Sequence, residues 1–248
     1  MTLPLAERRL DAVLIDIEGT TTPIAFVHDV LFPFARTHLA DWLEARSSSA
    51  EFNEVFEQLA REHAADRARG ANVPAWDTST LSATRASITR YAVALMDEDR
   101  KSPGLKLLQG LIWESGYQAG ELRGQVFVDV LPALHRWRAA GLRLAIYSSG
   151  SELAQRRLFE STPDGDLTPL FDGFFDTAVG GKKELESYRR IVERLRVAPE
   201  RTIFISDVTA ELDAAMGAGL QVILCLRDGN AVQPHAENYE RVLSFDRL

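Results

Sequence analysis

Two acidic residues, Asp16 and Glu18, follow a short apolar run and precede a glycine and three threonines. The run, Ala12 to Ile15, has the length and aliphatic composition of a strand that is buried on both faces. Open α/β sheets bind ligands at the carboxyl ends of such strands. A single acid there could simply cap the next helix. A pair of acids followed by Gly-Thr-Thr instead favours a catalytic or binding site.

Further reactive side chains follow later apolar runs in the same way. Ser148 and Ser149 follow Leu142 to Tyr147, Lys182 follows two glycines, and Asp207 follows Thr202 to Ser206. Each of these residues alone has an ordinary alternative role, as a helix cap or as a solvated lysine. Because the carboxyl ends of parallel strands meet at one edge of a sheet, their order along the chain indicates one shared site.

These residue types suit the hydrolysis of a phosphate ester. The negative phosphoryl oxygens repel a carboxylate nucleophile unless a cation offsets their charge. We expect Asp16 to attack phosphorus and form an aspartyl phosphate, with Lys182 as the fixed cation. Ser148 would donate a hydrogen bond to a phosphoryl oxygen. Glu18 would protonate the leaving oxygen and then activate water.

Oxygen donors near the same strand ends also predict a magnesium site. Mg²⁺ prefers oxygen ligands and keeps several of its waters. We expect Asp16, the backbone carbonyl of Glu18, and Asp207 to hold it. Glu211 would support the metal site from outside the ligand shell.

The elements that must position these residues fall into two groups. Helical spacing dominates from Phe26 to Ala45, with Pro33 expected to kink or divide the helix, and continues in Glu51 to Arg69, Thr80 to Met96 and Leu105 to Tyr117. Strands are expected at Gln125 to Val128, Leu142 to Tyr147, Phe174 to Val179, Thr202 to Ser206 and Gln221 to Leu226. A short helix and an edge element should end the chain.

Alternating strands and helices predict an α/β fold with a doubly wound parallel sheet. The helical block after the first strand is far longer than one βαβ crossover. We therefore expect a phosphatase core of residues 1–23 and 125–248, with an all-helical cap domain, residues 24–124, inserted into it.

Charge and composition limit the classes of partner that the protein is expected to bind. The net charge of −8 and the scattered Lys and Arg residues argue against nucleic-acid binding. No segment approaches the apolar length of a membrane helix. The single cysteine, Cys225, lies in an apolar run and is expected in the core of a protein from a reducing compartment. We expect a cytoplasmic monomer that acts on a small molecule.

Longer motifs carry a family resemblance. DIEGTT resembles the first signature of the haloacid dehalogenase superfamily of phosphatases, which has the order Asp, Ser or Thr, Lys, Asp. The segments LIDIEGTTTPIAFVHDVLFPFA, YSSGS, GKKELESY and SDVTAEL together resemble the enolase-phosphatases of the methionine salvage pathway. The resemblance implies a Rossmann-like core, substrate binding by Ser148, Ser149 and Lys182, and magnesium at Asp16, Glu18 and Asp207. It gives no role to Gly181 or Lys183.

The resemblance implies two reactions on 2,3-diketo-5-methylthiopentyl 1-phosphate. The substrate would be enolised and then dephosphorylated to the acireductone, 1,2-dihydroxy-3-keto-5-methylthiopentene. From the residues alone, only a magnesium-dependent phosphatase with a cap can be inferred. A phosphatase that acts on a sugar phosphate or a nucleotide is therefore an alternative. A phosphorylated signalling receiver is a further alternative, but its acceptor Asp follows a later strand and it has no helical insert.

Overall fold

The computed structural model describes residues 4–248 and divides the chain into two compact units. One unit ends its first part at His28 and resumes with Gly120–Leu248, and it contains the sheet. The other unit is Asp29–Ala119 and is helical. The boundaries expected from the sequence lay at residues 23 and 125, so the sheet unit also includes residues 24–28 and 120–124.

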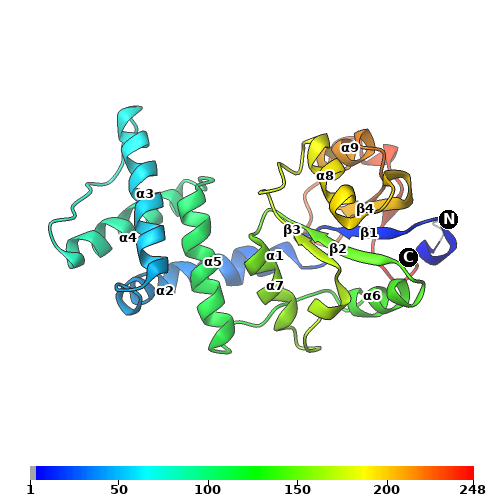
Figure 1. Ribbon diagram of the computed structural model, residues 1–248, viewed down its shortest axis with the longest axis horizontal. Helices are drawn as coiled ribbons and strands as arrows, with labels where there is room; N and C mark the ends of the chain where they lie inside the picture. Colours follow the sequence, from blue (N-terminus) through cyan, green and yellow to red (C-terminus); the bar gives the residue numbers. More distant parts are fainter. Residues whose placement is uncertain (1–3) are drawn as a thin grey trace. The chain divides into compact units, whose positions relative to one another are not determined.

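A parallel sheet forms the centre of the first unit (Figure 1). Its strands are β1 (Ala12–Ile15), β2 (Arg143–Tyr147), β3 (Gly173–Phe175), β4 (Thr202–Ser206), β5 (Gln221–Cys225) and β6 (Arg241–Val242). Their order in the sheet is β3-β2-β1-β4-β5-β6, and every neighbouring pair is parallel. The doubly wound parallel sheet expected from the sequence is thereby confirmed.

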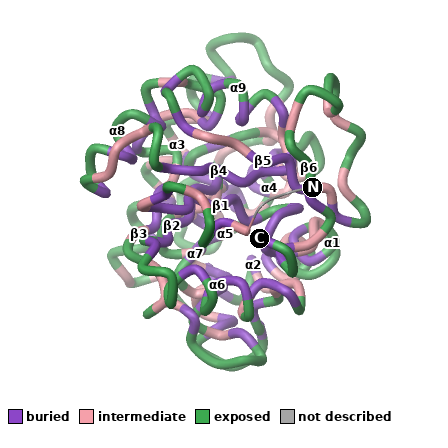
Figure 2. Tube along the Cα trace, turned by 90° about the vertical axis from the view of Figure 1, so that its right-hand side faces the viewer, coloured by how far each residue is buried: buried purple, intermediate pink, exposed green. Residues whose placement is uncertain are grey.

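Helices cover both faces of this sheet, which explains why β1 is apolar throughout and why β4 is buried along its whole length. Helices α8 (Leu185–Leu195) and α9 (Thr209–Gly217) lie on one face, and α6 (Val130–Ala139) and α7 (Glu152–Glu160) lie on the other (Figure 1). All four residues of β1 are buried, and Figure 2 shows its trace in the colour of buried residues. Cys225 is fully buried in β5, as expected.

The helical unit contains α2 (Phe32–Ala45), α3 (Ala50–Ala68), α4 (Leu81–Asp97) and α5 (Pro103–Gln118). Ser49, Thr80 and Ser102 accept a backbone N–H at the start of α3, α4 and α5, which satisfies amides that have no partner within the helix. The helix expected around Pro33 is divided into α1 (Ile24–Phe26), a π-helical turn (Val27–Leu31) and α2.

The helical unit contains a buried acid, Asp66, at the centre of a hydrogen-bond network. Asp66 of α3 accepts hydrogen bonds from Tyr91 Oη at 2.7 Å and from Arg100 Nη2 at 3.0 Å. Hydrogen bonding from Arg100 keeps the pKa of this carboxyl far below its usual value. The described helices include none that is both long enough and apolar enough to cross a membrane.

The strand expected at Gln125 to Val128 is wrong. This segment is irregular in the structure, and the side chain of Val128 is 96% exposed. The amide of Phe127 donates to the Thr21 carbonyl at 2.9 Å, outside the named strands. The Phe127 ring packs against Arg227 instead of pairing into the sheet, so an apolar run that resembles a short strand lies outside it.

Candidate active site

The expected site residues lie at the carboxyl ends of adjacent strands. Asp16 directly follows β1, Ser148 follows β2, and Asp207 follows β4. Because β1 pairs with both β2 and β4, the loop of Asp16 lies between the loops of the other two residues. All three side chains are buried.

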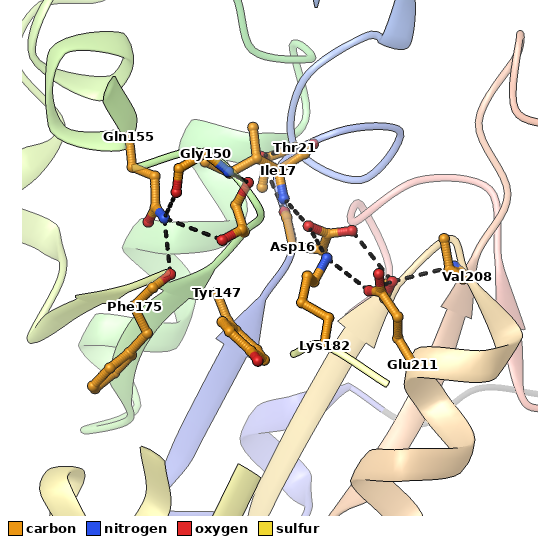
Figure 3. A network of polar contacts seen from close by, with 12 residues as sticks. Asp16, Ile17, Thr21, Tyr147, Gly150, Gln155, Phe175, Lys182, Val208 and Glu211 are labelled. Carbon is orange, nitrogen blue, oxygen red and sulfur yellow. Dashed lines mark hydrogen bonds and ion pairs between the residues drawn. The ribbon is translucent and has the colours of Figure 1, made fainter. Parts of the chain in front are cut away.

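Lys182 is the cation of this site (Figure 3). Its Nζ lies 2.6 Å from Asp16 Oδ1 and 2.7 Å from Glu211 Oε2. Ser206 Oγ donates to Glu211 Oε2 at 2.9 Å and lies 3.3 Å from Asp16 Oδ2, so its hydroxyl group bridges the two carboxylates. The sequence suggested Glu211 as support for a metal, whereas in the structure it contacts the lysine directly.

Negative charge exceeds positive charge in this buried cluster. Asp16 and Glu211 contact the one lysine, Asp207 lies within its electrostatic reach, and all four residues are at least 90% buried. Burial, reinforced by the charge of Asp16, raises the pKa of Asp207 and that of Glu211 to about 7. Burial opposes the charge of Lys182, but Asp16 and Glu211 outweigh it and raise the lysine pKa.

These raised pKa values predict how stability depends on pH. The pKa of Asp207 rises from 3.8 to about 7, so between these values the folded protein binds more protons than the unfolded chain. In the presence of a chelator, the free energy of unfolding should therefore fall as pH rises through this window. Asp207→Asn should remove part of this fall in stability. Its free energy of unfolding should exceed that of wild type by roughly 2–4 kcal/mol at pH 8, but by little at pH 4. Urea unfolding at both pH values measures the difference, and an equal gain at both would contradict the raised pKa.

The loop after Asp16 is a tight turn that needs glycine. The Ile17 carbonyl accepts the amides of Thr20, Thr21 and Thr22 at 3.1, 2.9 and 2.9 Å. Gly19 has a φ of +68°, and a Cβ at this position would lie 2.5 Å from Asp207 Oδ2. Glycine therefore fits both the backbone conformation and the close approach of the carboxylate. Glu18 is exposed on this loop.

The loop that carries Lys182 is held in place by side chains that donate to three of its consecutive backbone carbonyls. Tyr147 Oη donates to the Gly180 carbonyl at 2.9 Å, Ser187 Oγ to Gly181 at 2.8 Å, and Tyr188 Oη to Lys182 at 2.6 Å. The donors come from β2 and α8, so the backbone of the lysine is fixed to the packed core. This arrangement gives the Gly181 backbone a structural part that the sequence did not reveal.

Gln155 of α7 holds the serine loop in a similar way (Figure 3). Its Nε2 donates to the carbonyls of Phe175 at 2.8 Å and Gly150 at 2.9 Å, and lies 3.5 Å from that of Ser148. Ser148 Oγ accepts the amide of Gly150 at 3.2 Å. Ser149 is exposed on the same loop.

The donor set fits a hard cation in part. No group of three His, Cys, Asp or Glu side chains within residues 4–248 could hold a metal ion by itself. Asp16 and Asp207 instead offer carboxylate oxygens, and the excess of buried negative charge favours a cation beside them. One or two carboxylates, a backbone oxygen and waters make up a common magnesium shell.

Comparison with known proteins adds independent information. A model of the haloacid dehalogenase-like hydrolase family matches residues 10–219. The chain is 46% identical to an "Enolase-phosphatase E1" of Synechococcus elongatus over 248 residues, which cover 100% of both chains. It is also 46% identical to one from Frankia alni over 244 residues, covering 96% of this chain and 94% of the other.

A solved structure agrees with these sequence matches. The crystal structure of the UTR4 protein from Saccharomyces cerevisiae is 30% identical to this chain and aligns with a TM-score of 0.75. The alignment covers 96% of this chain and 100% of that chain. The similarity therefore extends over the sheet unit and the helical unit alike.

Proposed function

We infer the function of this chain from its family, because it belongs to the haloacid dehalogenase-like hydrolases and, within them, to the enolase-phosphatases. It is a bifunctional enolase-phosphatase of L-methionine salvage. It enolises 2,3-diketo-5-methylthiopentyl 1-phosphate and hydrolyses the phosphate to give 1,2-dihydroxy-3-keto-5-methylthiopentene. We further propose that the chain works as a cytoplasmic monomer.

One observation supports the assignment of the chemistry to particular residues. The buried ion pair of Asp16 and Lys182 stands at the carboxyl end of the central strand. A carboxylate that is buried and held by a cation is suited to attack phosphorus. In the proposed reaction Asp16 forms an aspartyl phosphate, while Lys182 offsets the charge of the nucleophile and of a phosphoryl oxygen.

Ser148 and Ser149 are proposed to bind the phosphate and Glu18 to move protons. Ser148 lies on a loop that Gln155 holds in place, so its hydroxyl is positioned before the substrate arrives. Glu18 is exposed beside the nucleophile, where a carboxyl group can exchange protons with substrate and water. It would protonate the leaving oxygen and later activate the water that attacks the acyl phosphate.

Mg²⁺ is the proposed cofactor. Asp16, Asp207 and the backbone carbonyl of Glu18 would hold it, and Glu211 would help to balance the charge nearby through Lys182. The ion would supply positive charge to the phosphoryl oxygens when bound. The excess of buried carboxylates supports this assignment.

Turnover of the diketone phosphate tests the function. The purified protein should release phosphate and form the enol, which absorbs light, and it should be slow on a panel of sugar phosphates and nucleotides. Excess chelator should stop phosphate release, and added Mg²⁺ should restore it, whereas Ca²⁺ should substitute poorly because its coordination is longer and looser. Equal rates across the panel would favour a general phosphatase. A stable phosphoprotein without turnover would favour a signalling receiver.

A further inference from the structure

We propose that the turn Arg227–Asn230, which follows β5, positions the nucleophile loop for catalysis. Its two side chains hold consecutive carbonyls of that loop. Asn230 Nδ2 donates to the Gly19 carbonyl at 2.9 Å, and Arg227 Nε donates to the Thr20 carbonyl at 3.2 Å. The inference rests on the proposed function because it takes Asp16 as the nucleophile.

The nucleophile loop needs support from outside because its own hydrogen bonds fix mainly its amides. Three of those amides converge on the Ile17 carbonyl, and the Gly19 amide donates to the Thr22 carbonyl at 2.8 Å. The carbonyls of Gly19 and Thr20 point instead to the turn after β5. Gly19 can rotate more freely than any other residue of the loop. Each donor from the turn therefore restrains one peptide group that lies within four residues of Asp16.

Arg227 is itself held firmly. It is 9% exposed, and its Nη1 lies 2.8 Å from Asp129 Oδ2 in an ion pair whose two side chains are each 5% exposed. Its guanidinium carbon lies 4.3 Å from the centre of the Phe127 ring and 4.7 Å from that of Phe245. A flat cation that packs against two aromatic rings is restrained in orientation as well as position. A surface arginine could not fix a peptide group in this way.

Asn230 connects the nucleophile loop to the last residue of β5. Its side-chain Nδ2 also lies 3.3 Å from the Cys225 carbonyl, and its backbone N–H donates to the Arg227 carbonyl at 3.1 Å. A Cβ on Gly19 would lie 2.9 Å from Asn230 Oδ1 and 2.5 Å from Asp207 Oδ2. The side chains of Asn230 and Asp207 therefore both crowd the space beside Gly19 that a larger residue would need. Loss of Asn230 would loosen the loop that lies beside Asp16 and Asp207.

Asn230→Ala tests the proposal with the full-length protein and the diketone phosphate. We expect kcat to fall by about 10- to 100-fold with KM changed less than about threefold, because a small displacement of the nucleophile affects the transition state more than the bound substrate. Orthovanadate, which imitates the transition state, should bind more weakly in proportion to kcat. The midpoint of thermal unfolding should stay near that of wild type, since Asn230 is only half-buried. Asp228→Ala is the matched control, because this exposed side chain of the same turn should leave kcat unchanged.

Arg227 provides a second pair of variants. Arg227→Lys keeps the charge beside Asp129 and one donor, so it should retain more of kcat than Arg227→Met, measured per folded molecule. Wild-type kcat and vanadate affinity in Asn230→Ala would overturn the positioning role, as would a loss of activity explained by unfolding alone. If wild type itself does not turn over the diketone phosphate, the proposed function fails instead. The two failures are therefore distinguishable.

Discussion

Asp16→Asn should reduce phosphate release from the diketone phosphate by at least about 10⁴-fold, the scale seen when a nucleophile is removed. The amide keeps the shape of the carboxyl group and can still accept the hydrogen bond that the Ile17 amide donates to Asp16 Oδ1 at 2.7 Å. The fold should therefore survive, while the negative charge that attacks phosphorus is lost. Phosphate release by the purified variant measures the effect. Substantial residual turnover would reject Asp16 as the nucleophile.

The same variant separates the two reactions. The carbon that bears the phosphate lies beside a carbonyl and carries acidic hydrogens, so enolisation should precede loss of phosphate. If Glu18 or a residue of the helical unit moves that proton, Asp16→Asn should still form the phosphorylated enol. Incubation in deuterated water should then give enol absorbance and deuterium at that carbon. Neither signal, with substrate shown to be bound, would mean that Asp16 serves both steps or that the enolase activity is wrongly assigned.

Lys182→Met should be the second most damaging change, because it removes the cation of the site while roughly keeping its volume. Three buried carboxyl groups would then face one another without a positive partner. We expect kcat to fall by about 10³-fold or more. Removing one partner of a buried ion pair also costs roughly 3–5 kcal/mol of stability at neutral pH. Steady-state kinetics and urea unfolding measure the two effects.

Lys183→Met is the matched control for this prediction, because Lys183 is the next residue and is exposed. It should leave both kcat and stability close to wild type. The stability deficit of Lys182→Met should shrink toward pH 4, since protonation removes the repulsion between the carboxyl groups. A deficit that is the same at pH 4 and pH 8 would show that lost packing, and not charge, accounts for it.

The sequence predicted best those elements whose pattern depends on burial alone. The bounds of β1 and β4 were predicted without error because both strands are buried along their whole length and each is followed directly by an acid. The segment Gln125 to Val128 was wrongly predicted because an apolar pattern does not distinguish a strand from a chain that packs against a buried arginine. Such a distinction depends on tertiary contacts, which a short window of sequence does not contain.

The candidate site shows the same limit. Asp16 and Asp207 were identifiable because each directly follows a buried strand. Lys182 was identifiable from the two glycines before it, although the strand expected at Phe174 to Val179 is only Gly173–Phe175 in the structure. Gln155 and Tyr188 were not, because they act on backbone carbonyls and interrupt no pattern. Glu211 was found through its spacing from Asp207, but its contact with Lys182 depends on a loop that begins far away in the sequence. A motif thus identifies the groups that react and misses those that hold them.

The central position of β1 has a consequence for folding during synthesis on the ribosome. This strand is made first, yet its partners are β2, which begins at Arg143, and β4, which begins at Thr202. The helices of residues 29–119 are made in between, and their contacts are local enough to form early. The strand that ends in Asp16 must therefore wait unpaired, with its apolar residues exposed, until most of the chain has emerged. The same topology that places the nucleophile at the centre of the sheet therefore leaves an apolar segment of the nascent chain open to aggregation until its partners have been made.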